Sequence, residues 1–146
     1  GDPPQRAEHA NVAPAGAPEI RRKLFDQPRN VALLTHLAEI YIRNKDFSMA
    51  ELIFNRALEI DPANPSVMAN IGSTNLFKRD YTKAKVWFEK AKDQPLALWG
   101  LAGLYKKFRF STKYQRTLAA AKTAGPARGI LHPLVSAKRN ESLESF

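Results

Sequence analysis

Apolar and small residues recur through the middle of the chain at the three- and four-residue spacing of amphipathic helices. From Val31 to Pro62 they form two runs, which are separated by a polar stretch around Lys45. The runs consist of Leu34, Leu37, Ala38 and Tyr41, then Ala50, Phe54 and Ala57. Each run predicts one helix, and the pair predicts a helical hairpin.

The second run returns 34 residues later along the chain. Ala50, Phe54 and Ala57 reappear as Ala84, Phe88 and Ala91, and the pair Asp46-Phe47 reappears as Asp80-Tyr81. A unit that recurs at this interval is a hairpin that cannot bury its apolar face alone and must stack on a neighbour. The sequence therefore predicts an all-α fold, an α-solenoid of about three helical hairpins.

The order of large and small residues in 31–62 resembles the tetratricopeptide repeat, and Pro62 follows where that family has its closing proline. A second unit, 65–96, has Asn75 where the family has an aromatic residue or Leu, and its proline comes early, at Pro95. A third, 95–126, has Tyr114 in place of a small residue, which should push its helices apart, and we expect the preceding loop to be four residues shorter.

The flanks differ in composition from these repeats, which we place in 29–126. Residues 1–18 predict a flexible Ala/Pro-rich linker, and 19–28 an N-terminal capping helix with Ile20, Leu24 and Phe25 on one side. Residues 127–146 predict a C-terminal capping helix and tail, whose apolar residues Ile130 to Val135 would cover the exposed end of the stack. The length of 146 residues fits one compact domain.

Catalytic chemistry has little support in this composition. There is no cysteine and there are only three histidines, so we expect no enzyme activity and no cofactor. His36 and Glu39 form at most half of a metal site. No apolar run is long enough to span a bilayer, and the compartment stays open between a tethered periplasmic protein and a cytoplasmic one.

The family resemblance implies that the first helices of the hairpins line a concave groove. Ten residues on these helices that the packing signature does not use are candidates for binding a partner there: Thr35, His36, Glu39, Arg43, Asn70, Ser73, Phe77, Trp99, Lys106 and Lys107. Phe77 and Trp99 would anchor apolar side chains, and the Asn70 amide can bond both N–H and C=O of a peptide. Gly100 and Gly103 would allow close approach. The alternative is that Phe77 and Trp99 pack against the linker or the C-terminal helix.

One subclass of this family binds chaperone C termini through a clamp of Lys, Asn and Arg side chains. Only Asn70 occupies a clamp-like position, and Glu39 would repel a carboxylate. The sequence therefore argues against a chaperone-tail co-chaperone.

Charge is distributed unevenly along the chain. Residues 97–128 contain seven Lys or Arg and no Asp or Glu, and so contribute +7 to the net +9. The basic patch in this stretch consists of Arg109, Lys113, Arg116 and Lys122, next to Lys106 and Lys107. It would attract an acidic partner, although a solvated face explains such a run equally well. Nucleic acid is the weaker alternative, because Tyr105 is needed in the core and Phe110 matches the turn residue Phe47.

We interpret the chain as a non-catalytic scaffold or adaptor that holds a partner peptide or subunit in the groove. The family resemblance suggests assembly of a larger complex, such as a secretion or pilus system. The alternative function is binding of nucleic acid or an acidic partner through the basic third repeat. Self-association through exposed repeat ends stays open.

Overall fold

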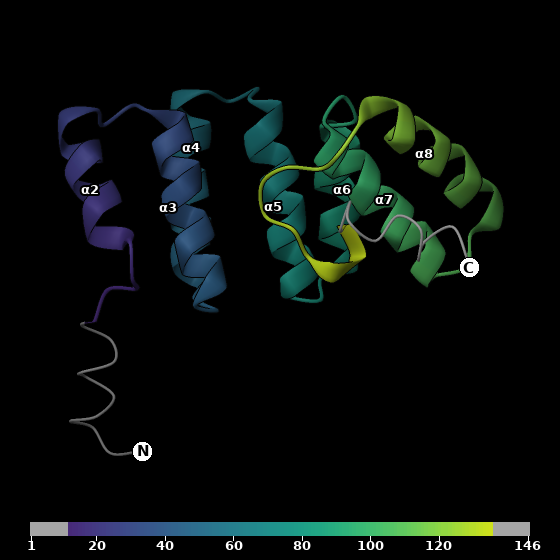
Figure 1. Ribbon diagram of the computed structural model, residues 1–146, viewed down its shortest axis with the longest axis horizontal. Helices are drawn as coiled ribbons and strands as arrows, with labels where there is room; N and C mark the ends of the chain where they lie inside the picture. The colour runs from purple at the N-terminus through teal and green to yellow at the C-terminus, as the bar shows by residue number, and fades with distance from the viewer. Residues whose placement is uncertain (1–11, 136–146) are drawn as a thin grey trace, which may run out of the picture. The chain divides into compact units, whose positions relative to one another are not determined.

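The computed structural model describes residues 12–135, and over this part of the chain it has seven α-helices, one 3-10 helix and no strand (Figure 1). The all-α expectation is confirmed. The chain divides into two compact units, one that ends at Ile60 and one that begins at Asp61, instead of the single domain that the length suggested. This division fits a repeat protein, since each hairpin contacts only its neighbours along the chain.

The first unit contains α2 (Ala17–Asp26), α3 (Val31–Arg43) and α4 (Phe47–Ile60). Helix α2 begins inside the segment predicted as linker, because Pro18 in its first turn has the φ angle that a helix start requires. Ile20 is buried and the Arg21 guanidinium donates to the Tyr41 hydroxyl at 2.7 Å, so α2 packs on α3. Phe25, expected on the packed side, is 87% exposed. The rest of the predicted linker, residues 1–11, lies outside the described chain.

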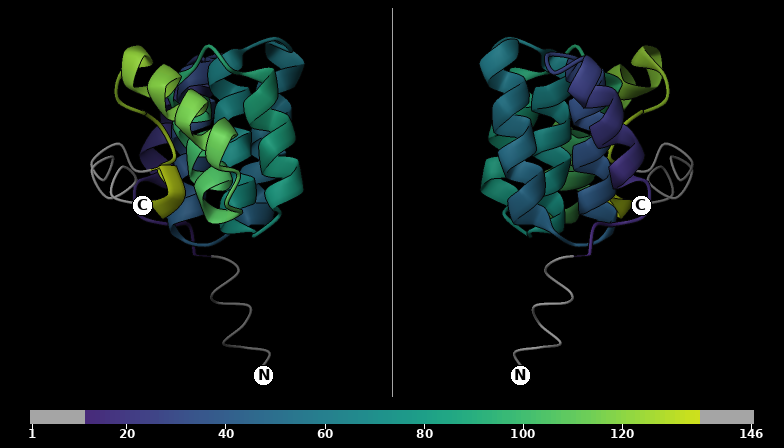
Figure 2. Two further views of the ribbon diagram at one scale, coloured as in Figure 1. Left: turned by 90° about the vertical axis from the view of Figure 1, so that its right-hand side faces the viewer. Right: turned by 90° about the vertical axis from the view of Figure 1, so that its left-hand side faces the viewer.

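The second unit contains α5 (Pro65–Phe77), α6 (Tyr81–Lys90), α7 (Pro95–Lys107), α8 (Ser111–Ala124) and the 3-10 helix η1 (Pro133–Val135). Helices α5 and α7 both start with a proline, whose missing N–H costs nothing in the first turn. Asn64 caps α5 by accepting the Val67 N–H at 3.0 Å. In the left view of Figure 2, α8 of this unit faces the viewer.

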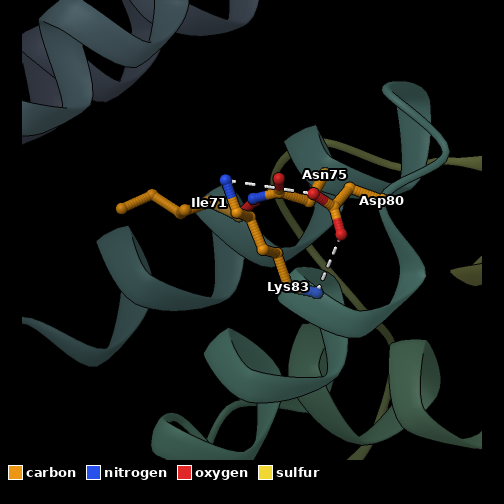
Figure 3. A network of polar contacts seen from close by, with 4 residues as sticks. All are labelled: Ile71, Asn75, Asp80 and Lys83. Atoms are coloured by element: carbon orange, nitrogen blue, oxygen red, sulfur yellow. Dashed lines mark hydrogen bonds and ion pairs between the residues drawn. The ribbon is translucent and has the colours of Figure 1, made fainter.

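The three hairpin turns share one geometry. Lys45, Arg79 and Arg109 adopt φ angles of 61°, 61° and 62°, in the left-handed region. In the first two turns the next residue is an aspartate that caps the following helix, as Asp80 does by accepting the Lys83 N–H at 3.1 Å (Figure 3). The third turn has Phe110 at this position, and its side chain makes no capping hydrogen bond. Phe110 therefore matches Asp46 and Asp80, and the predicted match with Phe47 was wrong by one residue.

The recurring small and aromatic residues are buried in every hairpin, as the pattern predicted. Ala50, Ala57, Ala84 and Ala121 are fully covered, and Phe54, Phe88 and Leu118 fill the space beside them. The Phe88 ring lies so close to Gly72 of α5 and Gly100 of α7 that a methyl group at either glycine would overlap it. Gly100 thus admits a core ring rather than a groove ligand.

The shorter second repeat loses a helical turn, not loop residues. The connections 61–64 and 91–94 have the same length, whereas α6 has 10 residues against 14 in α4 and α8. Four residues are close to one turn of helix. Pro95 opens α7 as Pro65 opens α5, and does not close the second repeat.

The predicted C-terminal capping helix is wrong for the part that the structure describes. Residues 125–135, here called the return segment, contain no α-helix, and only η1 is regular. Gly125 and Gly129 have φ angles of 101° and 110° and interrupt the helical pattern. The return segment runs from the end of α8 back across α5 and α7 (Figure 1). The remainder of the prediction, 136–146, lies outside the described residues.

Candidate functional site: a covered face of α5 and α7

The surface that matters most is one side of α5 and α7, here called the α5–α7 face and defined by Asn70, Ser73, Phe77, Trp99 and Gly103. The return segment lies on this face and contacts it from one end to the other. At its start, the Trp99 indole N–H donates to the carbonyl oxygen of Gly125 at 2.8 Å. Toward its end, the His132 ring meets the edge of Phe77, with centroids 4.7 Å apart.

The central contact is made by Asn70, whose side chain is 2% exposed. The Ile130 backbone N–H donates to Asn70 Oδ1 at 2.8 Å. Asn70 Nδ2 donates to the Ser66 carbonyl of its own helix, also at 2.8 Å, which fixes the amide orientation. Asn70 therefore makes one backbone bond to the segment and not the two that we predicted.

Two glycines allow the segment to approach so closely. The carbonyl oxygen of Leu134 occupies the place where Gly103 would carry a Cβ atom. Gly129 has a φ angle of 110°, and a Cβ atom added to it would lie 2.5 Å from Asn70 Oδ1, so a side chain there is excluded by strain and by overlap. Gly103 is thus a close-approach position, as the sequence suggested.

The segment also buries apolar side chains against this unit. Ala127, Ile130 and Val135 are 7%, 3% and 0% exposed, and Val135 belongs to the same apolar core as Trp99. Trp99 itself is 2% exposed. Trp99, Asn70 and Ser73 were expected to face an open groove. They are instead covered, which agrees with the alternative that the aromatic residues pack against the C-terminal part.

Ser73 is the least satisfied group on this face. It is fully buried, yet its Oγ has no hydrogen-bond partner among the described residues. A buried hydroxyl without a partner is costly, because it has lost its bonds to water. The return segment therefore covers the face without meeting all of its hydrogen-bonding capacity.

The His132 side chain fixes the η1 end of the return segment, and its ring is neutral there. Its Nδ1 accepts the Leu134 N–H at 3.1 Å, and its carbonyl oxygen accepts the Val135 N–H at 2.8 Å. Burial lowers the pKa of His132 below its ordinary value, and the positive charge of Lys107 lowers it further. A protonated ring is disfavoured here, since it loses hydration and faces a cation.

The candidates on α3 belong to the first unit and have a different setting. His36 and Arg43 are exposed, whereas Thr35 and Glu39 are partly covered. His36 and Arg43 line an open cavity of about 510 Å³ between α2 and α3, together with Glu19, Ile20 and Ile40. This face is open and carries both signs of charge.

The basic residues follow the end of α7 and then α8. Lys107, Arg109, Lys113, Arg116 and Lys122 are exposed, and Lys106 is partly buried. Lys107 and Lys113 lie over aromatic rings. Within residues 12–135 no group of three or more His, Cys, Asp or Glu residues could hold a metal ion, and no helix is long and apolar enough to cross a membrane.

Sequence reasoning missed the return segment as the partner of Asn70 and Trp99. Gly129 and the apolar residues around it were the available signal, but we read them as a helix.

Antiparallel α-helical hairpins with a shared turn and a recurring Ala/Phe/Ala core define a helical-repeat protein. The family model described as tetratricopeptide repeat matches residues 31–64 and 65–93, so these two segments are tetratricopeptide repeats.

The match covers α3 to α6 and ends before α7, so the third hairpin as a further repeat stays a prediction. A search of curated proteins finds none that matches the chain. Tetratricopeptide repeats generally mediate protein–protein interactions, and proteins of this family are typically non-catalytic scaffolds.

Proposed function

We propose that this protein is a protein-binding scaffold whose α5–α7 face recognises a non-helical protein segment, and that the return segment is its intramolecular occupant. The observation that carries the proposal is the bond from the Ile130 N–H to Asn70 Oδ1. Through such a bond a side-chain amide recognises the backbone of another segment. A partner that displaced the return segment would take its place.

The incomplete fit of the occupant supports exchange. Ser73 Oγ is buried without a hydrogen-bond partner among the described residues, so a partner segment with a suitably placed polar atom would gain a bond that the return segment lacks. Leu131 is 42% exposed and Gly129 is accessible, so the occupant covers the face with a thin layer of chain.

The contacts of the return segment support an expectation about which segments the face would select. The residue bonded to Asn70 places a large apolar side chain in the core, as Ile130 does, and the residue before it has no side chain, as at Gly129. The preferred partner is therefore a non-helical segment that bends at a glycine followed by a branched apolar residue. Backbone bonding supplies affinity and the apolar pocket supplies selectivity.

The test uses a fluorescent peptide of residues 127–135 and the full-length chain. Ile130→Asp in the protein should release its own segment, because a carboxylate cannot take the place of a buried isoleucine. The affinity of the peptide for this variant should then be at least about ten-fold higher than its affinity for wild type, as measured by fluorescence polarisation. Leu131→Asp is the matched control, since Leu131 is exposed and its own segment stays docked.

Adding Asn70→Ala to the Ile130→Asp protein should remove most of this binding, and a peptide that itself carries Ile130→Asp should not bind. Equal affinity for wild type and both aspartate variants would contradict the proposal. So would binding that survives Asn70→Ala.

A further inference from the structure

A second surface lies at the hairpin-turn end of the second unit. The first residues of α6, the end of α7 and the start of α8 enclose a pocket of about 330 Å³. We call it the aromatic–lysine pocket, and its walls are Tyr81, Thr82, Lys85, Leu104, Tyr105, Phe108, Phe110 and Lys113. This volume is at the lower end of the range for ligand pockets and suits one or two amino-acid side chains.

Two phenylalanine rings at its rim remain about half exposed to solvent. Phe108 and Phe110 are 49% and 55% exposed, and Phe110 stands at the capping position that aspartate occupies in the other two turns. An aromatic residue there gives up a hydrogen bond to the helix and remains in water. Clustered exposed rings of this kind mark interaction surfaces.

The charged side chains in the lining of the pocket are lysines. Lys113 lies 5.6 Å from the Phe110 centroid and 5.7 Å from that of Tyr105, and Lys107 lies 5.3 Å from Tyr81. No carboxylate lines this pocket among the described residues. The nearby Glu89 is already engaged, by Lys92 at 2.7 Å and by the Tyr105 hydroxyl at 3.2 Å.

The pKa values agree with this arrangement around Glu89. Burial alone would raise the pKa of Glu89, but hydrogen bonds and charges from Lys92, Tyr105 and Lys85 outweigh it, and the pKa is lowered. Burial and the Glu89 charge raise the pKa of Tyr105. The pocket thus presents a neutral phenol and ammonium groups, with the local carboxylate held as an anion at its edge.

The ring geometry favours a protein over nucleic acid. Tyr81 and Phe108 meet edge to face at 69°, and Tyr105 and Phe110 at 89°. Lysine ammonium groups lie over faces of all four rings. Stacked bases need open parallel faces, which this cluster does not offer, whereas an apolar side chain can enter between the ring edges.

We infer that the aromatic–lysine pocket binds an acidic segment of a partner protein, with an aromatic or large apolar side chain in the pocket and flanking carboxylates on Lys85, Lys107 and Lys113. The rings supply contact area and the lysines supply charge complementarity and a faster encounter. The occupancy of the α5–α7 face does not enter this argument.

The test uses the full-length chain and a labelled peptide in which one Phe is flanked on each side by two Glu. A peptide with Gln in place of Glu and a labelled oligothymidine are the comparison probes. The acidic peptide should bind best, and Lys85→Gln with Lys113→Gln should weaken it about ten-fold. Lys122→Gln, further along α8 and outside the pocket lining, is the matched charge control and should change affinity less than about two-fold.

Phe108→Ala should weaken the acidic peptide without changing its dependence on salt, because it removes contact area and no charge. Asn70→Ala should leave this binding unchanged, which separates the pocket from the α5–α7 face. Equal binding of the Glu and Gln peptides would overturn the inference. Tighter binding of oligothymidine, lost in the same lysine variants, would also overturn it and assign the pocket to nucleic acid.

Discussion

Residues that match across the first two repeats differ sharply in their surroundings. His36, Glu39 and Arg43 of α3 stand 34 positions before Asn70, Ser73 and Phe77 of α5. His36 and Arg43 are exposed beside an open cavity, whereas Asn70 is buried beneath the return segment and Ser73 is fully buried. The repeat therefore determines how the helices pack, and the residues outside its signature determine whether a face stays open.

The chemistry of the two sets follows this difference. The α3 positions carry ionisable groups that water can solvate. The α5 positions carry an amide, a hydroxyl and a phenyl ring, all of which can be covered at lower cost. Once the two repeats are aligned, the residue types at these positions therefore predict which face is exposed.

Replacing the largest covered side chain should sharpen this comparison most. Trp99→Ala should lower the free energy of unfolding of the second unit by about 3–5 kcal/mol, because it leaves a cavity and removes the bond to Gly125. Thr35→Ala, at the matching position of α3, should change it by less than about 0.5 kcal/mol. Urea unfolding measures both, and similar values for the two variants would break the comparison.

Gly103→Ala tests the close approach itself. Its methyl group would overlap the Leu134 carbonyl, so the full-length chain should lose about 1–3 kcal/mol of stability and its return segment should detach. In a chain that ends at Pro126 the same change should add about 0.5–1 kcal/mol, since alanine favours the helix.

Opposite signs in the two backgrounds are the expected result for Gly103→Ala. A loss of similar size in both would mean that the glycine serves α7 rather than the segment. The Ile130 amide signal in NMR spectra reports detachment directly.

The smallest effect should come from pH. Burial lowers the pKa of His132 in the docked state, so the released segment takes up a proton first as the pH falls. Docking should be fully stable above about pH 6.5, the ordinary value for histidine, and should weaken as the pH drops toward the lower docked value.

Chemical shifts of the Ile130 amide from about pH 7.5 to about pH 5 would follow this release. His132→Phe keeps a ring against Phe77 and should abolish the dependence. A dependence that persists in this variant would assign the effect to another group.

Much of the fold was predictable because its signals are local. The Ala50/Phe54/Ala57 series and its later copies follow from helical spacing alone, and all of these positions are buried. The four missing residues were assigned to the loop before the third repeat instead of to α6, because Pro95 can be read either as the end of one repeat or as the start of the next. The position of Phe110 was misread for a related reason, since the aspartate that marks the other turns is absent there.

The candidate site was predictable only in part. Asn70, Phe77 and Trp99 were identified as special, but their partner lies up to 60 residues away in sequence, and no periodicity reports such a contact. Tyr81, Lys85 and Phe108 were missed because α6 supplies the first two and the turn after α7 supplies the third. Their proximity depends on the packing of α6, α7 and α8.

A face that carries its own occupant imposes a threshold on outside competitors. A ligand on the same chain has an effective concentration in the millimolar range when its linkage is short, and a free partner has to exceed it in concentration or in intrinsic affinity. The few residues between α8 and Ile130 keep this linkage short. Abundant weak segments would then be rejected, and only a partner that improves on the single Asn70 bond would gain entry.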